Sequence, residues 1–437
     1  MRTPTLQYLY LQKPVTMILF ICIISVLPWL GLSELNAPAT SPDAAVADTM
    51  LKTGEWVLPV MPSGSVNYDH PMLHGLIVLF SYAQGYVSKF TLQLPGALAF
   101  IVMMVTSLIF FGRRVQFQEA FISTLFLITS FGMQNLSAAS SGDLLFATFI
   151  FVAMTQLYRW EEEWELKGIP VDIALLLSCA ILTKGLMGMI LPIATFTIYL
   201  LYTHKHSYLT IAKSMFYMAV SSLFLPVLWY VAIWKEGGMG LLQDVLAIEF
   251  SNFWGLEGDE HNFFYIIPLL AIGFMPWIFF FFFSLFGVKK ESVAFKGCSG
   301  VKLFSLVSLV VMLLAYAIMP VKRASYLLPV YPFITIFLAR YALYITEYRT
   351  LCTRLFAAVY SLLVLVGLML WMFPVEWGFL PIMEFSIRTS ILLVLTWLML
   401  FAVIYQMSRK INIKILYATI ALTFAVNMIV NASGLVG

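Results

Sequence analysis

The chain has 437 residues, of which 61% are hydrophobic and 11% are charged. A soluble domain carries charge on roughly a quarter of its residues, so this composition excludes a soluble globule and indicates a polytopic membrane protein. The net charge of +3 gives no reason to expect a nucleic acid partner, and the spacing of the four cysteines indicates neither a metal site nor a disulfide framework.

Thirteen apolar stretches are long enough to cross about 30 Å of hydrocarbon, which predicts an all-α bundle of about thirteen transmembrane helices. The first, near residues 14–32, follows Arg2 and Lys13 and lacks a small-residue cleavage site. It is therefore typical of a retained signal anchor with a cytoplasmic N-terminus. The others lie near 92–111, 117–135, 143–159, 170–183, 186–203, 212–234, 263–287, 303–319, 324–345, 353–373, 388–407 and 412–432.

The stretch 72–88 is short and contains His74 and two glycines. If it does not span, the basic loops fall on the cytoplasmic side, with 17 Lys and Arg inside and seven outside, as the positive-inside rule favours. If it spans, the same loops turn outward. We therefore expect a juxtamembrane or re-entrant helix here, on the outer side, and long outer loops over about 33–91 and 235–262.

Lys322 and Arg323, in the run MPVKRASYLLPVYP, face outward on this topology, against the general bias. Lys184, in ILTKGLMG, lies between two spans with hardly any loop, so its ammonium needs an anionic partner or a route to water, and snorkelling alone explains it equally well. Arginine offers a planar fork to phosphate oxygens and lysine a compact charge. Outward cations at the membrane surface thus suit a lipid phosphate.

Two acidic residues are placed at helix starts on the outer side. Ser41-Pro42-Asp43 is typical of an N-cap, a proline at N1 and an acid in the first turn of a short surface helix that closes at Gly54. Asp143, in SSGDLLFATFIF, opens a span. A helix-dipole partner explains Asp43 and a cap explains Asp143, but either carboxylate also suits general-base chemistry.

Asp69-His70-Pro71 leads into the juxtamembrane helix, and His74 lies one turn beyond His70 on the same face. Two histidines at this spacing can bind a metal ion, but no third ligand follows, so hydrogen bonding or ligand contact is favoured over a metal site. On the cytoplasmic side, the acidic run at 161–165 is expected to be a solvated loop.

An outward carboxylate beside outward cations suits the transfer of a group from a phosphate-linked lipid to an acceptor hydroxyl or amine. The carboxylate takes the acceptor proton, and the cations stabilise the phosphate that leaves. A transporter or flippase of lipid-linked sugars is the alternative from another class. It favours ionisable residues at mid-membrane and discontinuous spans in paired halves, and the sequence indicates neither.

Five stretches resemble the polytopic glycosyltransferases of the GT-C type, in the family 39-like branch that holds the protein O-mannosyltransferases and the lipid A aminoarabinose transferase. They are AVADTMLKTGEWVLPV with NYDHPMLHG, then LQLPGALA, SSGDLLFATF, LTKGLMG and PVKRASYLLPVYPF, in the family's order from about residue 34 to 334. The resemblance implies a GT-C type bundle with an inward N-terminus, juxtamembrane helices in the first outer loop and an active site on the outer face.

The resemblance also implies roles for particular residues. Asp143 falls where the family has a second acidic residue, and Tyr326 belongs to the last motif. Lys184, Lys322 and Arg323 fall where the family has cations thought to meet the lipid phosphate.

Two positions depart from the family pattern. Its first acidic residue falls on Ala39-Thr40, neither of which can act as a base, and Asp43, one helical turn further on, is the nearest substitute. Its Lys-Pro-Pro element reads Asp69-His70-Pro71 in this chain. The departures leave three interpretations: a shifted base, an altered reaction, or a catalytically inactive relative that acts as a scaffold.

We therefore expect a glycosyltransferase of the cell inner membrane that moves a sugar from a polyprenyl-phosphate carrier to an extracytoplasmic lipid, glycan or protein hydroxyl, among membrane lipids. No cofactor is expected, because the lipid-phosphate sugar is a substrate, and no divalent cation is indicated. The catalytic core is expected over 1–345, with additional transmembrane helices over 346–437 and no soluble tail domain. The expected catalytic residues are Asp43 and Asp143, and the expected substrate-binding residues are Lys184, Lys322, Arg323, His70, Asp69 and Tyr326.

Overall fold

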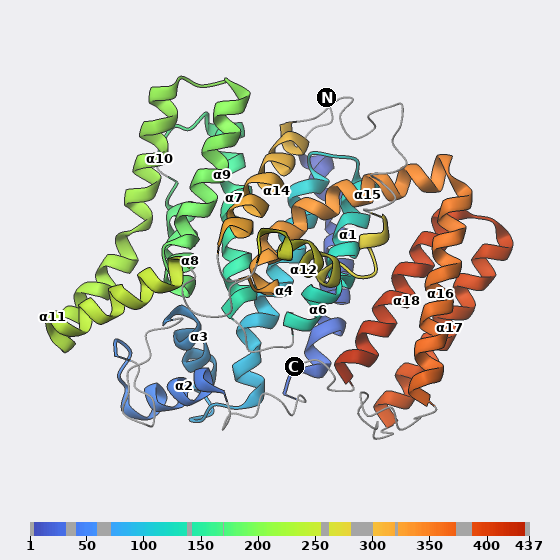
Figure 1. Cartoon of the computed structure of the whole chain (residues 1–437), viewed down its shortest axis with the longest axis horizontal. Helices are drawn as coiled ribbons and strands as arrows, with labels where there is room; N and C mark the ends of the chain where they lie inside the picture. The colour runs from blue at the N-terminus through green and yellow to red at the C-terminus, as the bar shows by residue number, and fades with distance from the viewer. Residues whose placement is uncertain are drawn as a thin grey trace.

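The computed structural model describes residues 4–31, 41–58, 71–137, 142–168, 170–254, 262–280, 300–319, 322–372 and 387–432. Within these ranges every regular element is a helix, which confirms the predicted all-α class (Figure 1). Helices satisfy their own backbone hydrogen bonds, which is what hydrocarbon demands of any segment that crosses it.

The first half of the chain forms the elements α1 (Pro4–Val26), η1 (Leu27–Trp29), α2 (Pro42–Thr53), α3 (Pro71–Ser81), α4 (Lys89–Gly112), α5 (Phe117–Thr129), α6 (Phe131–Ser137), α7 (Gly142–Trp164), α8 (Val171–Lys184), α9 (Met187–Thr203) and α10 (Tyr208–Ser222). The second half forms α11 (Phe224–Trp254), η2 (Phe263–Tyr265), α12 (Ile266–Gly273), α14 (Gly300–Ile318), η3 (Ala324–Val330), α15 (Tyr331–Tyr348), α16 (Thr350–Met372), α17 (Ile387–Arg409) and α18 (Asn412–Ala432).

Seven of the described helical runs are long and apolar enough to cross a membrane, or up to eight if the bent pair α6 and α7 is one span. Shorter apolar helices, among them α5 and α9, accompany them. The chain is thus a protein with membrane-spanning helices, and the count of thirteen spans stays a prediction.

Some predicted boundaries are wrong. The predicted span 117–135 is divided at Ser130, whose extended backbone (φ −69°, ψ 136°) ends α5 before α6 begins at Phe131. The predicted outer loop 235–262 is helical up to Trp254, because α11 continues across a kink at Gly238. Gly238 has φ 77°, in the left-handed region that glycine adopts without steric cost.

Large aromatic side chains fill the core of the bundle. The ring of Phe304 on α14 lies 4.9 Å from that of Tyr158 and 5.2 Å from that of Tyr199, between centroids. Close packing also depends on small residues, since a Cβ at Gly273 would lie 1.8 Å from the Tyr331 hydroxyl. These rings fix how α7, α9, α14 and α15 meet, because interiors packed at this density tolerate little change in shape.

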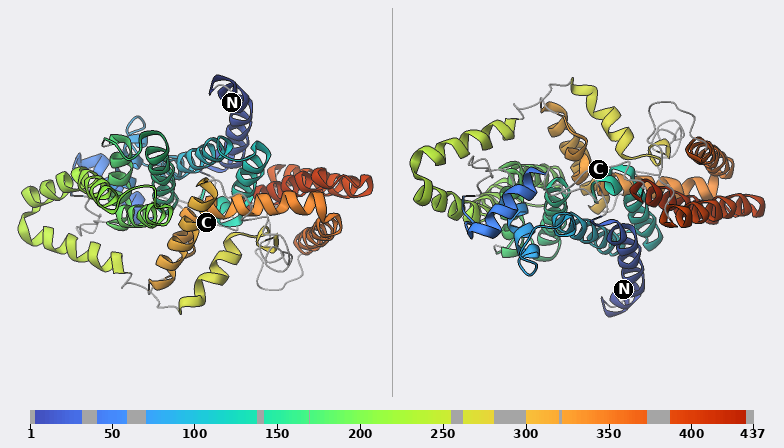
Figure 2. Two further views of the ribbon diagram at one scale, coloured as in Figure 1. Left: turned by 90° about the horizontal axis from the view of Figure 1, so that it is seen from above. Right: turned by 90° about the horizontal axis from the view of Figure 1, so that it is seen from below.

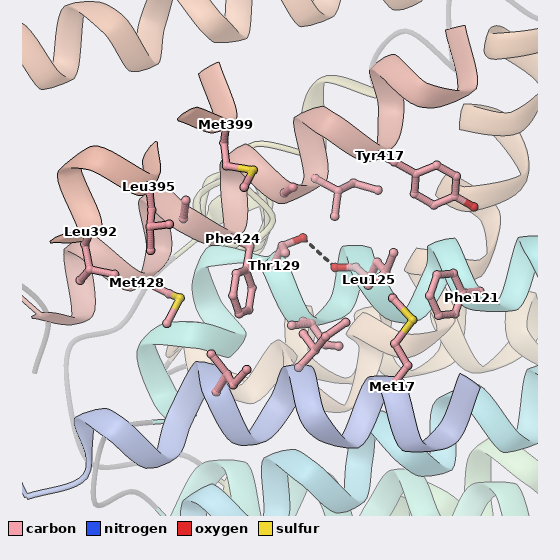
Figure 3. Close-up of a pocket in the computed structure, with 16 residues that line it drawn as sticks. Met17, Phe121, Leu125, Thr129, Leu392, Leu395, Met399, Tyr417, Phe424 and Met428 are labelled. Atoms are coloured by element: carbon pink, nitrogen blue, oxygen red, sulfur yellow. Dashed lines mark hydrogen bonds between the residues drawn. The ribbon is translucent and has the colours of Figure 1, made fainter. Parts of the chain in front are cut away.

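The three C-terminal helices α16, α17 and α18 share a second hydrophobic cluster, which also includes Trp29 of η1. An apolar cavity of about 640 Å³ lies between them and the main bundle, lined by side chains from α1, α5, α17 and α18 (Figure 3). Its polar lining residues are Thr129 and Tyr417, and the Thr129 hydroxyl already donates to the Leu125 carbonyl. No charged side chain lines the cavity, so it offers nothing to hold a phosphate.

The surface helices α2 and α3 lie together at the lower end of the bundle in Figure 1, and the first described residues lie at the upper end. As predicted, α2 begins after Ser41 with Pro42 and Asp43 in its first turn, and it ends at Gly54, which has φ 76°. Helix α3 (Pro71–Ser81) begins one residue before the predicted juxtamembrane stretch 72–88 and covers its first part. The second view in Figure 2 shows α2 and α3 beside α4 from below.

Candidate active site

Asp143 and Lys184 meet where α7 begins and α8 ends. The two helices are consecutive and pack against each other, so the start of one lies beside the end of the other. The Lys184 ammonium forms an ion pair with Asp143 Oδ1, and the two side chains are 17% and 20% exposed. Asp143 therefore supplies the anionic partner that a lysine so close to hydrocarbon needs.

An aromatic pair flanks this ion pair. The Lys184 Nζ atom lies 5.4 Å from the centroid of the Tyr326 ring, which is the distance of a cation–π contact. Tyr326, on η3, stacks on Tyr316 of α14, with 6.1 Å between centroids. Tyr316 is buried and was not predicted as part of the site. Its position near the end of an apolar span is the only signal that the sequence offers for it.

Lys322 and Arg323 lie just before η3 but occupy different environments. The Lys322 side chain is buried and donates to the Met319 carbonyl oxygen at 2.7 Å, whereas Arg323 is exposed. Arg323 has an extended backbone (φ −113°, ψ 143°), and consecutive side chains on extended backbone point in opposite directions. The sequence presents the two cations as an equivalent pair, but the local backbone separates them.

Asp43 and His74 join the two surface helices. The His74 Nε2 atom lies 2.9 Å from Asp43 Oδ1, across a contact between α3 and α2. The His74 side chain is fully buried, and that of Asp43 is 23% exposed. Helix α3 also packs against α8, the helix that ends in Lys184. The Asp43 pair and the Lys184 pair therefore lie at the same end of the bundle.

The remaining predicted site residues, Asp69 and His70, lie outside the described residues, as does Thr40. The described part of the chain contains no group of three or more His, Cys, Asp or Glu residues that could hold a metal ion. The pair of Asp43 and His74 thus has no third described ligand.

The acidic run at 161–165 is solvated except at Glu161, as predicted, but most of it is helix and not a loop. Helix α7 extends to Trp164, so the first acids lie on its last turn. Glu161 is buried and accepts from Lys205 at 2.9 Å, and Glu162 accepts from Arg114 Nε at 3.0 Å. These acids tie the end of α7 to neighbouring elements at the end of the bundle opposite to the candidate site.

The fold is that of the polytopic glycosyltransferases of the GT-C type. The structure of ArnT from Cupriavidus metallidurans bound to undecaprenyl phosphate superposes with a TM-score of 0.68, over 98% of this chain and 78% of ArnT, at 17% sequence identity. The resemblance that the five sequence stretches indicate is thus confirmed for the fold.

Relatives of this chain also match in sequence, among them the following two proteins. An uncharacterized protein of Aquifex aeolicus is 28% identical over 315 residues, which are 71% of this chain and 60% of that protein. An undecaprenyl phosphate-alpha-4-amino-4-deoxy-L-arabinose arabinosyl transferase of Shewanella sediminis is 20% identical over 60% of this chain and 48% of the transferase. The match thus spans about half to three fifths of the length of these relatives, and no family model matches the chain.

Proposed function

We propose that this chain is a glycosyltransferase of the inner membrane that moves a sugar from a polyprenyl-phosphate-linked donor to an extracytoplasmic acceptor. The observation that carries the proposal is the gathering of a partly exposed carboxylate, Asp43, and three cations, Lys184, Lys322 and Arg323, at one end of an apolar bundle. The likeness to a structure bound to undecaprenyl phosphate, and a relative named as an arabinosyl transferase, support the same class of donor.

Asp43 is the proposed general base. Its carboxylate lies on a surface helix with about a quarter of the side chain exposed, so an acceptor can reach it. The acceptor hydroxyl gives its proton to Asp43 while its oxygen attacks the anomeric carbon of the donor sugar. The bond between that carbon and the phosphate oxygen breaks, and the electron pair leaves with the polyprenyl phosphate.

The cations stabilise the phosphate that leaves. Lys184 is already neutralised by Asp143, so the exposed Arg323 is the group best placed to meet the incoming phosphate, and Lys322 lies directly before it. Positioned charges of this kind act most strongly in a site from which water is excluded. Asp143 orients the acceptor or shares the base role, and Tyr326 holds the Lys184 ammonium against its ring. Asp69 and His70 are proposed to contact the donor.

Sugar transfer by purified protein from a radiolabelled polyprenyl-phosphate sugar tests the proposal. We expect the wild type to release polyprenyl phosphate, and Asp43→Asn to slow release roughly a hundredfold or more, the usual loss for a general base. Asp48→Asn is the matched control, because Asp48 lies on the same helix in an exposed ion pair with Lys52. Transfer by Asp43→Asn at the wild-type rate would overturn the base assignment.

A catalytically inactive scaffold is the second candidate. Two observations favour it: the mutual pairing of Asp143 with Lys184, and Thr40 at the position where the family has an acid. Such a protein binds polyprenyl phosphate but releases none from the labelled donor, whichever acceptor is supplied. Binding without release, set beside an active ArnT control, would decide for the scaffold.

A further inference from the structure

His74 is buried more completely than any role in substrate contact requires. Its side chain has no exposed surface, and its helix α3 packs against α2, α4 and α8. Next to it on α3, the apolar residues Leu73, Ile77 and Val78 are buried as well. An imidazole in such a place is costly unless its nitrogens are hydrogen-bonded.

Only one of those nitrogens has a partner among the described residues. Nε2 lies 2.9 Å from Asp43 Oδ1, while the buried Nδ1 has none there. A helix-dipole role for Asp43 needs no histidine, and the N-cap residue Ser41 makes no side-chain cap bond. Unpaired buried polar groups are rare in folded proteins and call for an explanation other than packing. The explanation that fits is that His74 is kept for what it does to the carboxylate.

We propose that His74 is the positioning residue of Asp43: its Nε2–H donates to Oδ1 and so turns Oδ2 toward the acceptor. This inference rests on the proposed function. During transfer the acceptor proton goes to Oδ2, and His74 keeps its own proton throughout.

Two substitutions of nearly equal size separate this role from packing. In His74→Gln the amide nitrogen falls near the place of Nε2 and can still donate to Oδ1. In His74→Asn the shorter side chain puts its amide near the place of Nδ1, out of reach of Asp43. We expect Gln to keep kcat within about threefold of the wild type and Asn to lower it roughly ten- to a hundredfold, as for residues that orient a reacting group.

Binding and coupling measurements complete the test. The dissociation constant for polyprenyl phosphate should stay within twofold in both variants, because His74 does not touch the donor. The double variant Asp43→Asn/His74→Asn should be no slower than Asp43→Asn alone, since groups that act as a unit are not additive.

Three results would overturn the inference: Asn as active as Gln, losses that multiply in the double variant, or a poorly folded Asn variant with Gln equally inactive. All three require an active wild type. A wild type that transfers no sugar is instead a failure of the proposed function, so the two failures are distinguished.

Discussion

At the end of the bundle where α5 and α14 begin, Glu119 and Lys302 bury their charges against each other, with 3.1 Å between Oε1 and Nζ. At the end where α7 begins, by contrast, Arg323 is exposed and Asp43 keeps 23% of its side chain exposed. A buried pair serves packing and cannot bind anything else, whereas a charge held at the surface stays available to a ligand. Charge is therefore buried in a pair at one end, while at the other end Arg323 and part of the Asp43 side chain face the surface.

The largest expected effect is a yes-or-no difference in labelling, because the two ends of the bundle are expected on opposite sides of the membrane. A single cysteine introduced as Arg323→Cys should react with a membrane-impermeant maleimide in intact cells. The native Cys352, exposed near the start of α16, should react only after permeabilisation. Cys22, Cys179 and Cys298 are replaced by serine in both samples, and Cys352 is replaced as well in the Arg323→Cys sample. A cysteine at position 323 that reacts only after permeabilisation would remove the proposed site from the outer face.

The next largest effect concerns catalysis. Arg323→Ala should lower transfer roughly a hundredfold, as loss of one group that stabilises a leaving oxyanion does, while the amount of protein in the membrane stays unchanged. Arg323→Lys should recover only part of the rate, because a point charge cannot offer the planar fork. Steady-state release of polyprenyl phosphate measures both. Equal rates for Ala and wild type would break the contrast between the two ends.

At the opposite end of the bundle, substitutions should change the free energy of unfolding. Glu119→Ala leaves the buried Lys302 without its described carboxylate and should cost about 3 kcal/mol of unfolding free energy. Thermal unfolding in detergent measures the loss. The paired variant Glu119→Leu/Lys302→Met should recover much of it, because apolar groups of similar volume replace both charges. Transfer by the protein that remains folded should be unchanged.

The smallest effect should come from the exposed pair of Glu165 and Lys167. The Lys167 side chain donates to Glu165 and lowers the pKa of that carboxyl. Any stability from the pair is therefore present above the ordinary pKa of glutamate and is lost as the pH falls through the lowered value. Both side chains are mostly exposed, so Lys167→Ala should leave the unfolding temperature at pH 7 unchanged. A clear drop in the unfolding temperature would show that the acidic run at 161–165 as a whole stabilises the fold.

Much of the fold follows from local signals that a sequence carries openly. Apolar length and the positive-inside bias predict where helices such as α4, α14 and α18 lie. Proline after serine, and a later glycine, predict α2 with both of its ends. The break at Ser130 and the continuation of α11 were missed, because an apolar run has the same composition whether it is straight, broken or bent.

The candidate site was predicted as single residues and not as pairs. Asp43 and His74 are 31 positions apart, and their contact depends on how α2 and α3 pack. Asp143 and Lys184 were given separate roles, yet they neutralise each other. Hydropathy and capping patterns act within one helix, so they hold no information on which side chains meet across two. The different environments of Lys322 and Arg323 likewise come from backbone geometry that no spacing encodes.

The pair of Glu119 and Lys302 has a consequence for biosynthesis. The two residues are 183 positions apart, so the ribosome adds the acid long before the base. Until α14 has been made, the Glu119 carboxylate on α5 lacks the base with which it pairs in the folded protein. Synthesis of α14 is therefore the event after which this buried pair can form, which sets an order for the last packing steps of the nascent chain.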